Sequence, residues 1–155
     1  MSDAWLSDEV VQRCGWLVAG FRRWTGRELM TDLPHDPTAL ARALYDAPFV
    51  VVSHGTQADP IFWFANRTAQ RLWEVDWATF IRMPSRQSVE AGEHDDRERL
   101  LARAKAHGYV DDYQGVRISA SGRRFRIQNV VLWNLRNEHD KPAGQAATFA
   151  DWTFL

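Results

Sequence analysis

The chain has 155 residues, of which 45% are hydrophobic, 25% charged and 12% aromatic, and 19 basic side chains face 20 acidic ones for a formal net charge of −1. This composition is typical of one globular domain and excludes a disordered chain, which would need fewer aromatic residues and a less balanced charge. It also argues against a protein that mainly binds nucleic acid, because phosphate contacts need a basic excess.

Cysteine content and the N-terminus indicate where the protein works. Cys14 is the only cysteine, so no intrachain disulfide can form, and a reducing compartment is expected. The first nine residues carry three acidic side chains and lack the basic start and apolar run of a secretory signal. The longest apolar stretches, residues 14–21 and 47–53, are far shorter than the ~20 residues that cross a bilayer. We therefore expect a cytoplasmic protein without a membrane contact.

The N-terminal segment predicts an amphipathic helix over residues 7–24. Ser7 is the expected N-cap, and Gly26 stands where a helix commonly ends. Its apolar residues recur at spacings of three and four, which places them on one stripe: Val10, Cys14, Leu17, Val18, Phe21 and Trp24. After a linker at residues 31–35, a second helix should begin at Asp36, with Pro37 in its first turn, and end before Pro48.

The middle of the chain alternates short strands with helices. Residues 49–52 and 61–65 are rich in β-branched and aromatic residues and predict two strands that form a hairpin. Asn66 is then the expected cap of a helix carrying Leu72 and Trp73, and residues 76–81 predict a short helical piece. The charged residues 93–105 predict a longer helix that ends at Gly108, with Leu100, Leu101 and Ala104 facing inward.

The last third predicts three antiparallel strands, at residues 113–119, 124–135 and 145–152, joined by hairpins. Five strands in this order favour an α+β domain, with a five-stranded antiparallel sheet and helices on one face. Strict alternation places Phe125, Ile127, Asn129 and Val131 on the face opposite Arg126, Gln128, Val130 and Leu132.

The second of these faces is unusually apolar. Val130, Leu132, Trp152 and Phe154 would form a patch that another element must cover. The amphipathic N-terminal helix is the expected cover, from its own chain or from a partner. We therefore expect a homodimer through the N-terminal helix and the outer sheet face.

These segments resemble the PAS domains, and among them the small PAS-like family called MEKHLA. The resemblance lies in residues 47–55 (APFVVVSHG), in residues 60–66 (PIFWFAN) with the helix that ends at Leu72 and Trp73, in residues 111–119 and 121–125, and in residues 144–149 (GQAATF). It covers roughly residue 40 to the C-terminus. The resemblance implies a five-stranded sheet and a sensory role in binding a small molecule or a protein. We divide the chain into an N-terminal helix and linker, residues 1–35, and a PAS-like domain, residues 36–155.

A ligand pocket between the sheet and the helices is the main functional hypothesis. Two asparagines, Asn66 and Asn129, would orient a ligand, while Arg86 would bind a carboxylate or phosphate at the mouth. The remaining candidate ligand-binding residues are Phe49, Val51, Phe62, Phe64, Trp73, Tyr113, Ile118, Phe125 and Ile127. The alternative is a filled core in which the asparagines only satisfy backbone groups.

The cofactor is not identified by any motif. Covalent flavin photochemistry would need a cysteine near the pocket, whereas residues 83–87 contain none. Non-covalent flavin stays open, and haem would need an axial ligand such as His94 or His107. His94 with Glu90, Asp95 and Glu98 has the donor types of a metal site, but a solvated helix start explains these residues more simply, so no metal is expected.

Two other functions remain as alternatives. A small cone-shaped α+β enzyme would use an acid-base pair such as His54 and Asp112, with Asp111 and Tyr113 as further candidates, in an apolar cavity. A pure dimerisation or protein-interaction module would need no ligand. The motifs of nucleophile elbows and phosphate loops do not occur in the sequence, so the enzyme is the less favoured reading.

Overall fold

The fold was analysed in a computed structural model that describes residues 4–155, so Asp3 of the acidic N-terminus lies outside the described part. The helices are η1 (Ala4–Leu6), α1 (Asp8–Thr25), α2 (Pro37–Tyr45), α3 (Arg67–Trp73), α4 (Trp77–Phe80), η2 (Ser85–Ser88), η3 (Ala91–Glu93) and α5 (His94–His107). The strands are β1 (Val50–His54), β2 (Phe62–Ala65), β3 (Tyr109–Ile118), β4 (Arg124–Arg136), β5 (Pro142–Phe149) and β6 (Asp151–Phe154). Among residues 4–155 no helix has the length and apolar character needed to cross a membrane.

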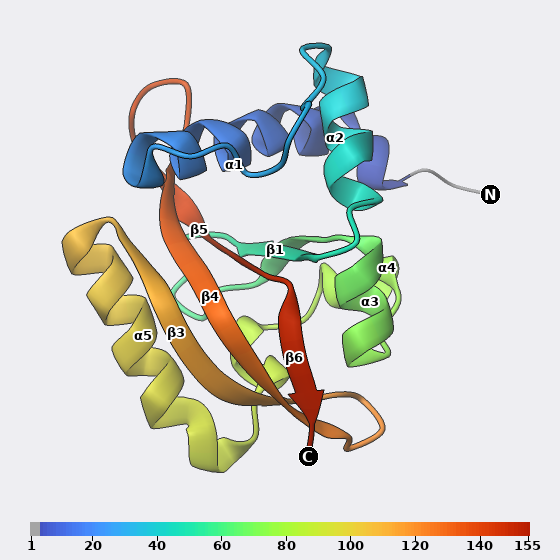
Figure 1. The fold of residues 1–155 in the computed structure, drawn as a ribbon, viewed down its shortest axis with the longest axis vertical. Helices are drawn as coiled ribbons and strands as arrows, with labels where there is room; N and C mark the ends of the chain where they lie inside the picture. The colour runs from blue at the N-terminus through green and yellow to red at the C-terminus, as the bar shows by residue number, and fades with distance from the viewer. Residues whose placement is uncertain (1–3) are drawn as a thin grey trace.

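The strands form one antiparallel sheet in the order β2-β1-β5-β4-β3, with α5 alongside β3 (Figure 1). This order confirms the predicted α+β fold and both predicted hairpins between β3, β4 and β5. The third predicted strand is interrupted at Ala150, and its second part, β6, pairs with the beginning of β4. β5 and β6 therefore lie one after the other along the same edge of β4.

Side chains cap the main helices where the sequence predicts them. Ser7 accepts a hydrogen bond from the backbone N–H of Val10 at 3.3 Å, and Gly26 ends α1 with a φ of 72°. Asp36 accepts from the N–H of Ala39 at 2.9 Å, with Pro37 as the first helical residue. These caps fix α1 and α2 at the predicted positions.

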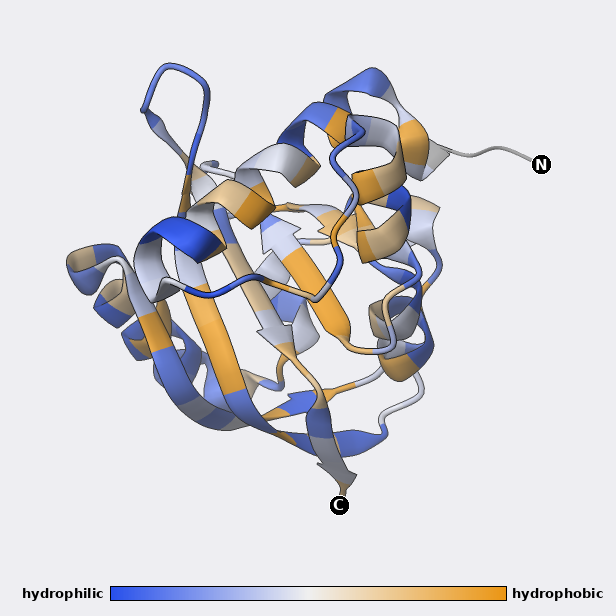
Figure 2. Ribbon diagram, turned by 45° about the horizontal axis from the view of Figure 1, so that its top comes forward, coloured by the Kyte–Doolittle hydropathy of each residue, from blue (hydrophilic) through white to orange (hydrophobic). Residues whose placement is uncertain are grey.

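The sheet carries a hydrophobic core on each face. The inner core lies between the sheet and the helices α3 to α5, and the outer core lies under α1 and α2. Figure 2 shows hydrophobic residues along the central strands, whereas α5 is mostly hydrophilic. Trp133 of β4 is fully buried in the outer core, where its indole N–H donates to the carbonyl of Leu17 at 3.2 Å. The helix α1 thus covers the outer face of its own chain.

A bulge in β4 changes which side chains face each core. Tyr113 pairs with Val130 and Gly115 with Ile127, so two residues of β4 between these pairs oppose one of β3. Asn129, with a φ of 53°, lies within this bulge. Strict alternation therefore holds only up to Gln128, and the predicted faces from Asn129 onward are wrong.

The apolar surface on the outer face consists of other residues than the expected ones. Val130 and Leu132 belong to the inner core, and Trp152 and Phe154 pair with Ile127 and Phe125 on that same side. The residues that α1 covers are instead Val131, Trp133 and Leu135. Before the bulge β4 faces the inner core on one side only, whereas beyond it the strand is buried on both faces.

Candidate functional site

A cavity of about 60 Å³ lies on the inner face of the sheet, between β1, β4 and β5 and the segment from η2 to α5. One water fills about 10–15 Å³ of such space, so the cavity holds roughly four to six non-hydrogen atoms. The apolar wall comes mostly from strands and consists of Val52, Phe62, Trp73, Leu100, Leu101, Ile127, Val130, Leu132, Ala147 and Phe149. The polar end consists of His54, Ser85, Ser88, Arg97 and Arg117.

His54 is the last residue of β1 and has only 8% of its surface exposed. Its Nδ1 lies 3.1 Å from the carbonyl oxygen of Gly55, which can only accept, so Nδ1 carries the proton. Nε2 is buried and has no hydrogen-bond partner within residues 4–155. Burial lowers the pKa of His54, the bond to Gly55 raises it, and the charge of Arg97 lowers it. The neutral ring therefore offers the cavity an unused acceptor.

Arg97 comes from α5 and is 5% exposed. Its Nη2 donates to the hydroxyl of Ser85, and its Nη1 donates to Glu98 at 2.7 Å. Burial lowers the pKa of Arg97, the Glu98 carboxylate raises it, and the nearby Arg117 lowers it. The Glu98 side chain is 68% exposed, so the only ion-pair partner of Arg97 in the described residues is largely in solvent.

Arg117 enters from β3 and is 7% exposed. Its side-chain hydrogen bonds within residues 4–155 both use Nη1, to the carbonyl of Val116 at 2.9 Å and to the hydroxyl of Tyr113 at 3.3 Å. The Tyr113 hydroxyl donates in turn to Asp96. Arg117 thus reaches a carboxylate only through Tyr113 and forms no salt bridge of its own in the described part of the chain. The cavity therefore combines an apolar wall with a cationic end.

The structure brings some of the expected ligand-binding residues to this cavity. Phe62, Trp73 and Ile127 line it. Phe125 and Tyr113 pack in the same inner core without lining the cavity. Ile118, the last residue of β3, is partly buried and is not part of the wall.

Three of the expected residues lie on the opposite face. Phe49, Val51 and Phe64 pack in the outer core with α1 and α2. All five residues of β1 are buried, so burial on both faces removes the alternation that would have fixed its phase. Phe62 of β2 pairs with His54 of β1, but Phe64 pairs with Ser53. This irregularity in the pairing places the two phenylalanines on opposite faces of the sheet.

Asn66 lies between the two cores with its hydrogen-bonding capacity used. Its Oδ1 accepts from the N–H groups of Val51 and Ala69, both at 3.1 Å. Its Nδ2 donates to the carbonyls of Leu44 at 3.0 Å and Phe49 at 2.7 Å. The side chain therefore ties α2, β1 and α3 together, as in the alternative in which it satisfies backbone groups.

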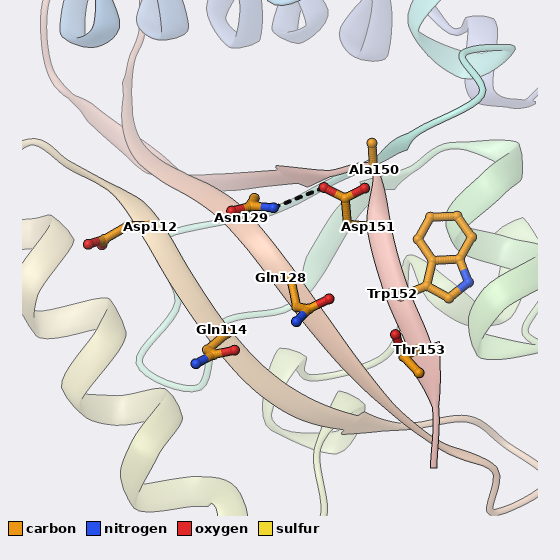
Figure 3. Close-up of a pocket in the computed structure, with 8 residues that line it drawn as sticks. All are labelled: Asp112, Gln114, Gln128, Asn129, Ala150, Asp151, Trp152 and Thr153. Atoms are coloured by element: carbon orange, nitrogen blue, oxygen red, sulfur yellow. Dashed lines mark hydrogen bonds between the residues drawn. The ribbon is translucent and has the colours of Figure 1, made fainter.

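Asn129 lies on the outer face, away from the cavity. It is exposed and donates to Asp151 at 3.0 Å, as Figure 3 shows. Both residues line an open groove whose other lining residues are Asp112, Gln114, Gln128, Ala150, Trp152 and Thr153. This part of the outer face is not covered by α1, and it is polar rather than apolar. The bulge at Asn129 is the reason that the side chain points away from the inner core.

Arg86 is half-exposed and forms an ion pair with Asp59 at 3.1 Å, outside the cavity wall. The guanidiniums at the cavity are those of Arg97 and Arg117, which the sequence analysis missed. Arg97 precedes Leu100 by three positions and Ala104 by seven, so it continues the apolar stripe of α5. This spacing on α5 was the sequence feature that could have indicated an inward side chain for Arg97. For Arg117, the corresponding feature was its spacing from Tyr113 on the strand.

The alternative sites are not assembled. His54 lines the cavity, but Asp112 is exposed on the groove, so the acid-base pair is not brought together. Asp111 is exposed as well. Within residues 4–155 no group of three or more histidine, cysteine or acidic residues is placed to hold a metal. His94 and His107 are not among the cavity residues.

Comparison with known proteins agrees with this geometry. The MEKHLA domain family model matches residues 11–154. Two homeobox-leucine zipper proteins HOX32 of rice, from the japonica and indica subspecies, are each 22% identical over 143 residues. That match covers 90% of this chain and 16% of each relative, so the chain spans a small part of the length of these relatives.

Solved structures share the fold at low identity. A PAS domain from Colwellia psychrerythraea is 13% identical with a TM-score of 0.62, covering 74% of this chain and 92% of that one. An RNA-binding Light-Oxygen-Voltage receptor is 20% identical with a TM-score of 0.63, covering 82% and 36%. The light-state dimer of the fungal blue-light photoreceptor Vivid is 13% identical with a TM-score of 0.59, covering 88% and 92%.

A flavin, which the sequence left open as a cofactor, does not fit the cavity of this chain. Pockets for larger ligands measure about 300–1,000 Å³, several times the cavity volume of about 60 Å³. Cys14 lies in the outer core on the other side of the sheet, and burial raises the pKa of its thiol to about 12. The same size argument applies to haem. The cavity volume leaves room only for a much smaller molecule.

Proposed function

The chain belongs to the MEKHLA domain family, and from that premise we propose that it is a sensory domain that binds a small molecule in the inner cavity and acts through a partner. The PAS-like fold places the cavity between the sheet and the helices α3 to α5. Its apolar wall and polar end match what small-molecule sites commonly offer. The proposed ligand contacts among the expected residues are Phe62, Trp73 and Ile127, with Phe125 and Tyr113 supporting them.

One observation carries the proposal: His54 lines the cavity, and its Nε2 is buried without a hydrogen-bond partner among residues 4–155. A buried polar atom that loses its water without gaining a partner destabilises the fold, by about 1–3 kcal/mol. A molecule in the cavity that forms a hydrogen bond with Nε2, as donor to the neutral ring or as acceptor from the protonated ring, would remove this cost. The two buried arginines that line the cavity with His54 support the same conclusion, since guanidinium groups are strong hydrogen-bond donors.

A test can change the cavity volume without touching its polar end. Ala147 lines the cavity, so A147L would fill much of it, whereas A150L adds the same side chain at an exposed position. Ligand-observed NMR with compounds of up to about six non-hydrogen atoms should find binders for the native full-length chain and for A150L. The same compounds should not bind A147L, which circular dichroism should show to be folded.

Two outcomes would contradict the proposed function. If none of the compounds binds the native chain, and native mass spectrometry shows only the bare protein mass, an interaction module without a ligand becomes the better account. If A147L binds as well as the native chain, the ligand lies outside this cavity.

The homodimer expected from the sequence belongs to this proposal. Since α1 already covers Val131, Trp133 and Leu135 of its own chain, a dimer through α1 must use its outward side or exchange α1 between two copies. Deleting residues 1–31 should expose the outer core and give an aggregating or monomeric protein. An unchanged stable dimer in analytical ultracentrifugation would contradict this interface. A cytoplasmic location is part of the same proposal.

A further inference from the structure

The polar end of the cavity indicates the chemical class of the ligand. We propose that the cavity holds a short-chain aliphatic monocarboxylate, with its carboxylate between Arg97 and Arg117 and its hydrocarbon tail against the apolar wall. This inference rests on the proposed function and adds the identity of the ligand class. It depends on charge, on donor geometry and on size, in that order.

Arg97 and Arg117 place two positive charges in the cavity wall, whereas the carboxylates near them, of Glu98, Asp59 and Asp96, do not line it. Arg97 and Arg117 are both more than nine-tenths buried, and the effect of Arg117 on the pKa of Arg97 shows that the two charges are close enough to repel each other. In the described chain their only direct carboxylate partner is the mostly exposed Glu98. A buried guanidinium without a counter-charge is strongly destabilising, and an anion in the cavity would supply that charge.

The free donors suit a carboxylate. Because Nη1 makes both side-chain hydrogen bonds that Arg117 forms with the described residues, its Nε and Nη2 are left for a ligand. The planar fork of a guanidinium matches the two oxygens of a carboxylate. A bound anion would also favour the protonated form of His54, whose Nε2 would then donate a hydrogen bond instead of lacking one.

The rest of the cavity limits the ligand further. Ten apolar side chains, among them Ile127, Leu132 and Phe149, line the cavity together with its five polar residues, so much of the ligand surface must be apolar. Inorganic phosphate would fit by size, but it would place oxygens against this apolar wall without partners. Propionate and butyrate fit both the available volume and the division into a charged head and an apolar tail.

Isothermal titration calorimetry of the full-length chain with propionate, in a buffer free of carboxylate and phosphate, tests the assignment. Propionamide has nearly the same shape without the charge, and we expect it to bind at least about 10-fold more weakly. R117M should weaken propionate binding by about 10–100-fold. R86M, which removes an exposed arginine paired with Asp59, should leave it unchanged. R117K keeps the charge but loses the fork, so it should show an intermediate loss, and it serves if R117M does not fold.

Each outcome decides between the two proposals. Equal affinity for propionate and propionamide, equal losses in R117M and R86M, or binding of phosphate alone would overturn the monocarboxylate assignment and leave a ligand-binding cavity in place. If propionate, phosphate and the neutral compounds of the NMR screen all fail to bind, both proposals are overturned. Propionate binding that is retained by A147L would also overturn the assignment, because the tail would then lie elsewhere.

Discussion

Replacing Asn66 by alanine should destabilise the fold more than any ordinary loss of a helix cap. The substitution removes four hydrogen bonds, to the N–H groups of Val51 and Ala69 and to the carbonyls of Leu44 and Phe49. Asn66 is fully buried, so water cannot replace these partners. At about 1 kcal/mol for each bond, with a further penalty for groups left unsatisfied, we expect a loss of about 3–6 kcal/mol. Domains are stable by only about 5–15 kcal/mol, so this loss is large.

Urea unfolding followed by circular dichroism and by tryptophan fluorescence measures this loss. Asp36 is the matched control because it caps α2 through one hydrogen bond, to Ala39, and is exposed. D36A should cost about 1 kcal/mol. If N66A costs no more than D36A, the reasoning about buried backbone partners is refuted.

Two further predictions concern the cavity and the outer core. The pKa of His54 is lowered in the native chain, so below pH 6.5, its ordinary pKa, the unfolded chain takes up a proton at this position and the native chain does not. The free energy of unfolding should therefore fall as the pH falls from 6.5 towards the lowered pKa, by at most about 1.4 kcal/mol per pH unit. H54Q should remove this part of the slope in urea titrations and H139Q, at an exposed turn, should not; parallel curves for H54Q and the native chain would contradict the assignment. W133A should lower the free energy of unfolding by about 3–5 kcal/mol, because Trp133 is fully buried and bonded to Leu17, and a loss below about 1 kcal/mol in the same assay would mean that α1 does not depend on this contact.

The helices were predictable because local signals set them. Ser7, Asp36 and Asn66 each stand one residue before a helix and cap it with a side chain. Pro37 and Gly26 mark a beginning and an end in the same way. These signals need no knowledge of distant contacts, so the bounds of α1 and α2 agree with the predicted ones closely.

The faces of the strands were not predictable to the same degree. β1 is buried on both sides, so its residues carry no alternation, and Val51 could be placed on either face. The bulges in β2 and β4 each reverse the alternation of inward and outward side chains once. No residue next to Trp63 or Asn129 in the sequence indicates that a bulge is present there. The errors at Phe64 and Asn129 follow from this.

The polar end of the cavity was missed for a related reason. Arg117 belongs to a run of basic residues that would ordinarily lie on a solvated face, and burial of an arginine is rare enough that sequence reasoning assigns it to the surface. Only the tertiary contacts with Tyr113 and the packing of α5 over β3 place it inside. The amino-acid composition does not indicate that Arg117 is buried.

Beyond the bulge at Asn129, β4 lines the cavity with one face and the outer core with the other. Val130 and Leu132 face the cavity, while Val131 and Trp133, one residue away from each, support α1. The cavity and the N-terminal helix are therefore separated by the thickness of a single strand. We therefore expect a displacement of β4 that makes space for a ligand to move the surface on which α1 packs. A substitution on one face of this strand should therefore also affect the packing on its other face.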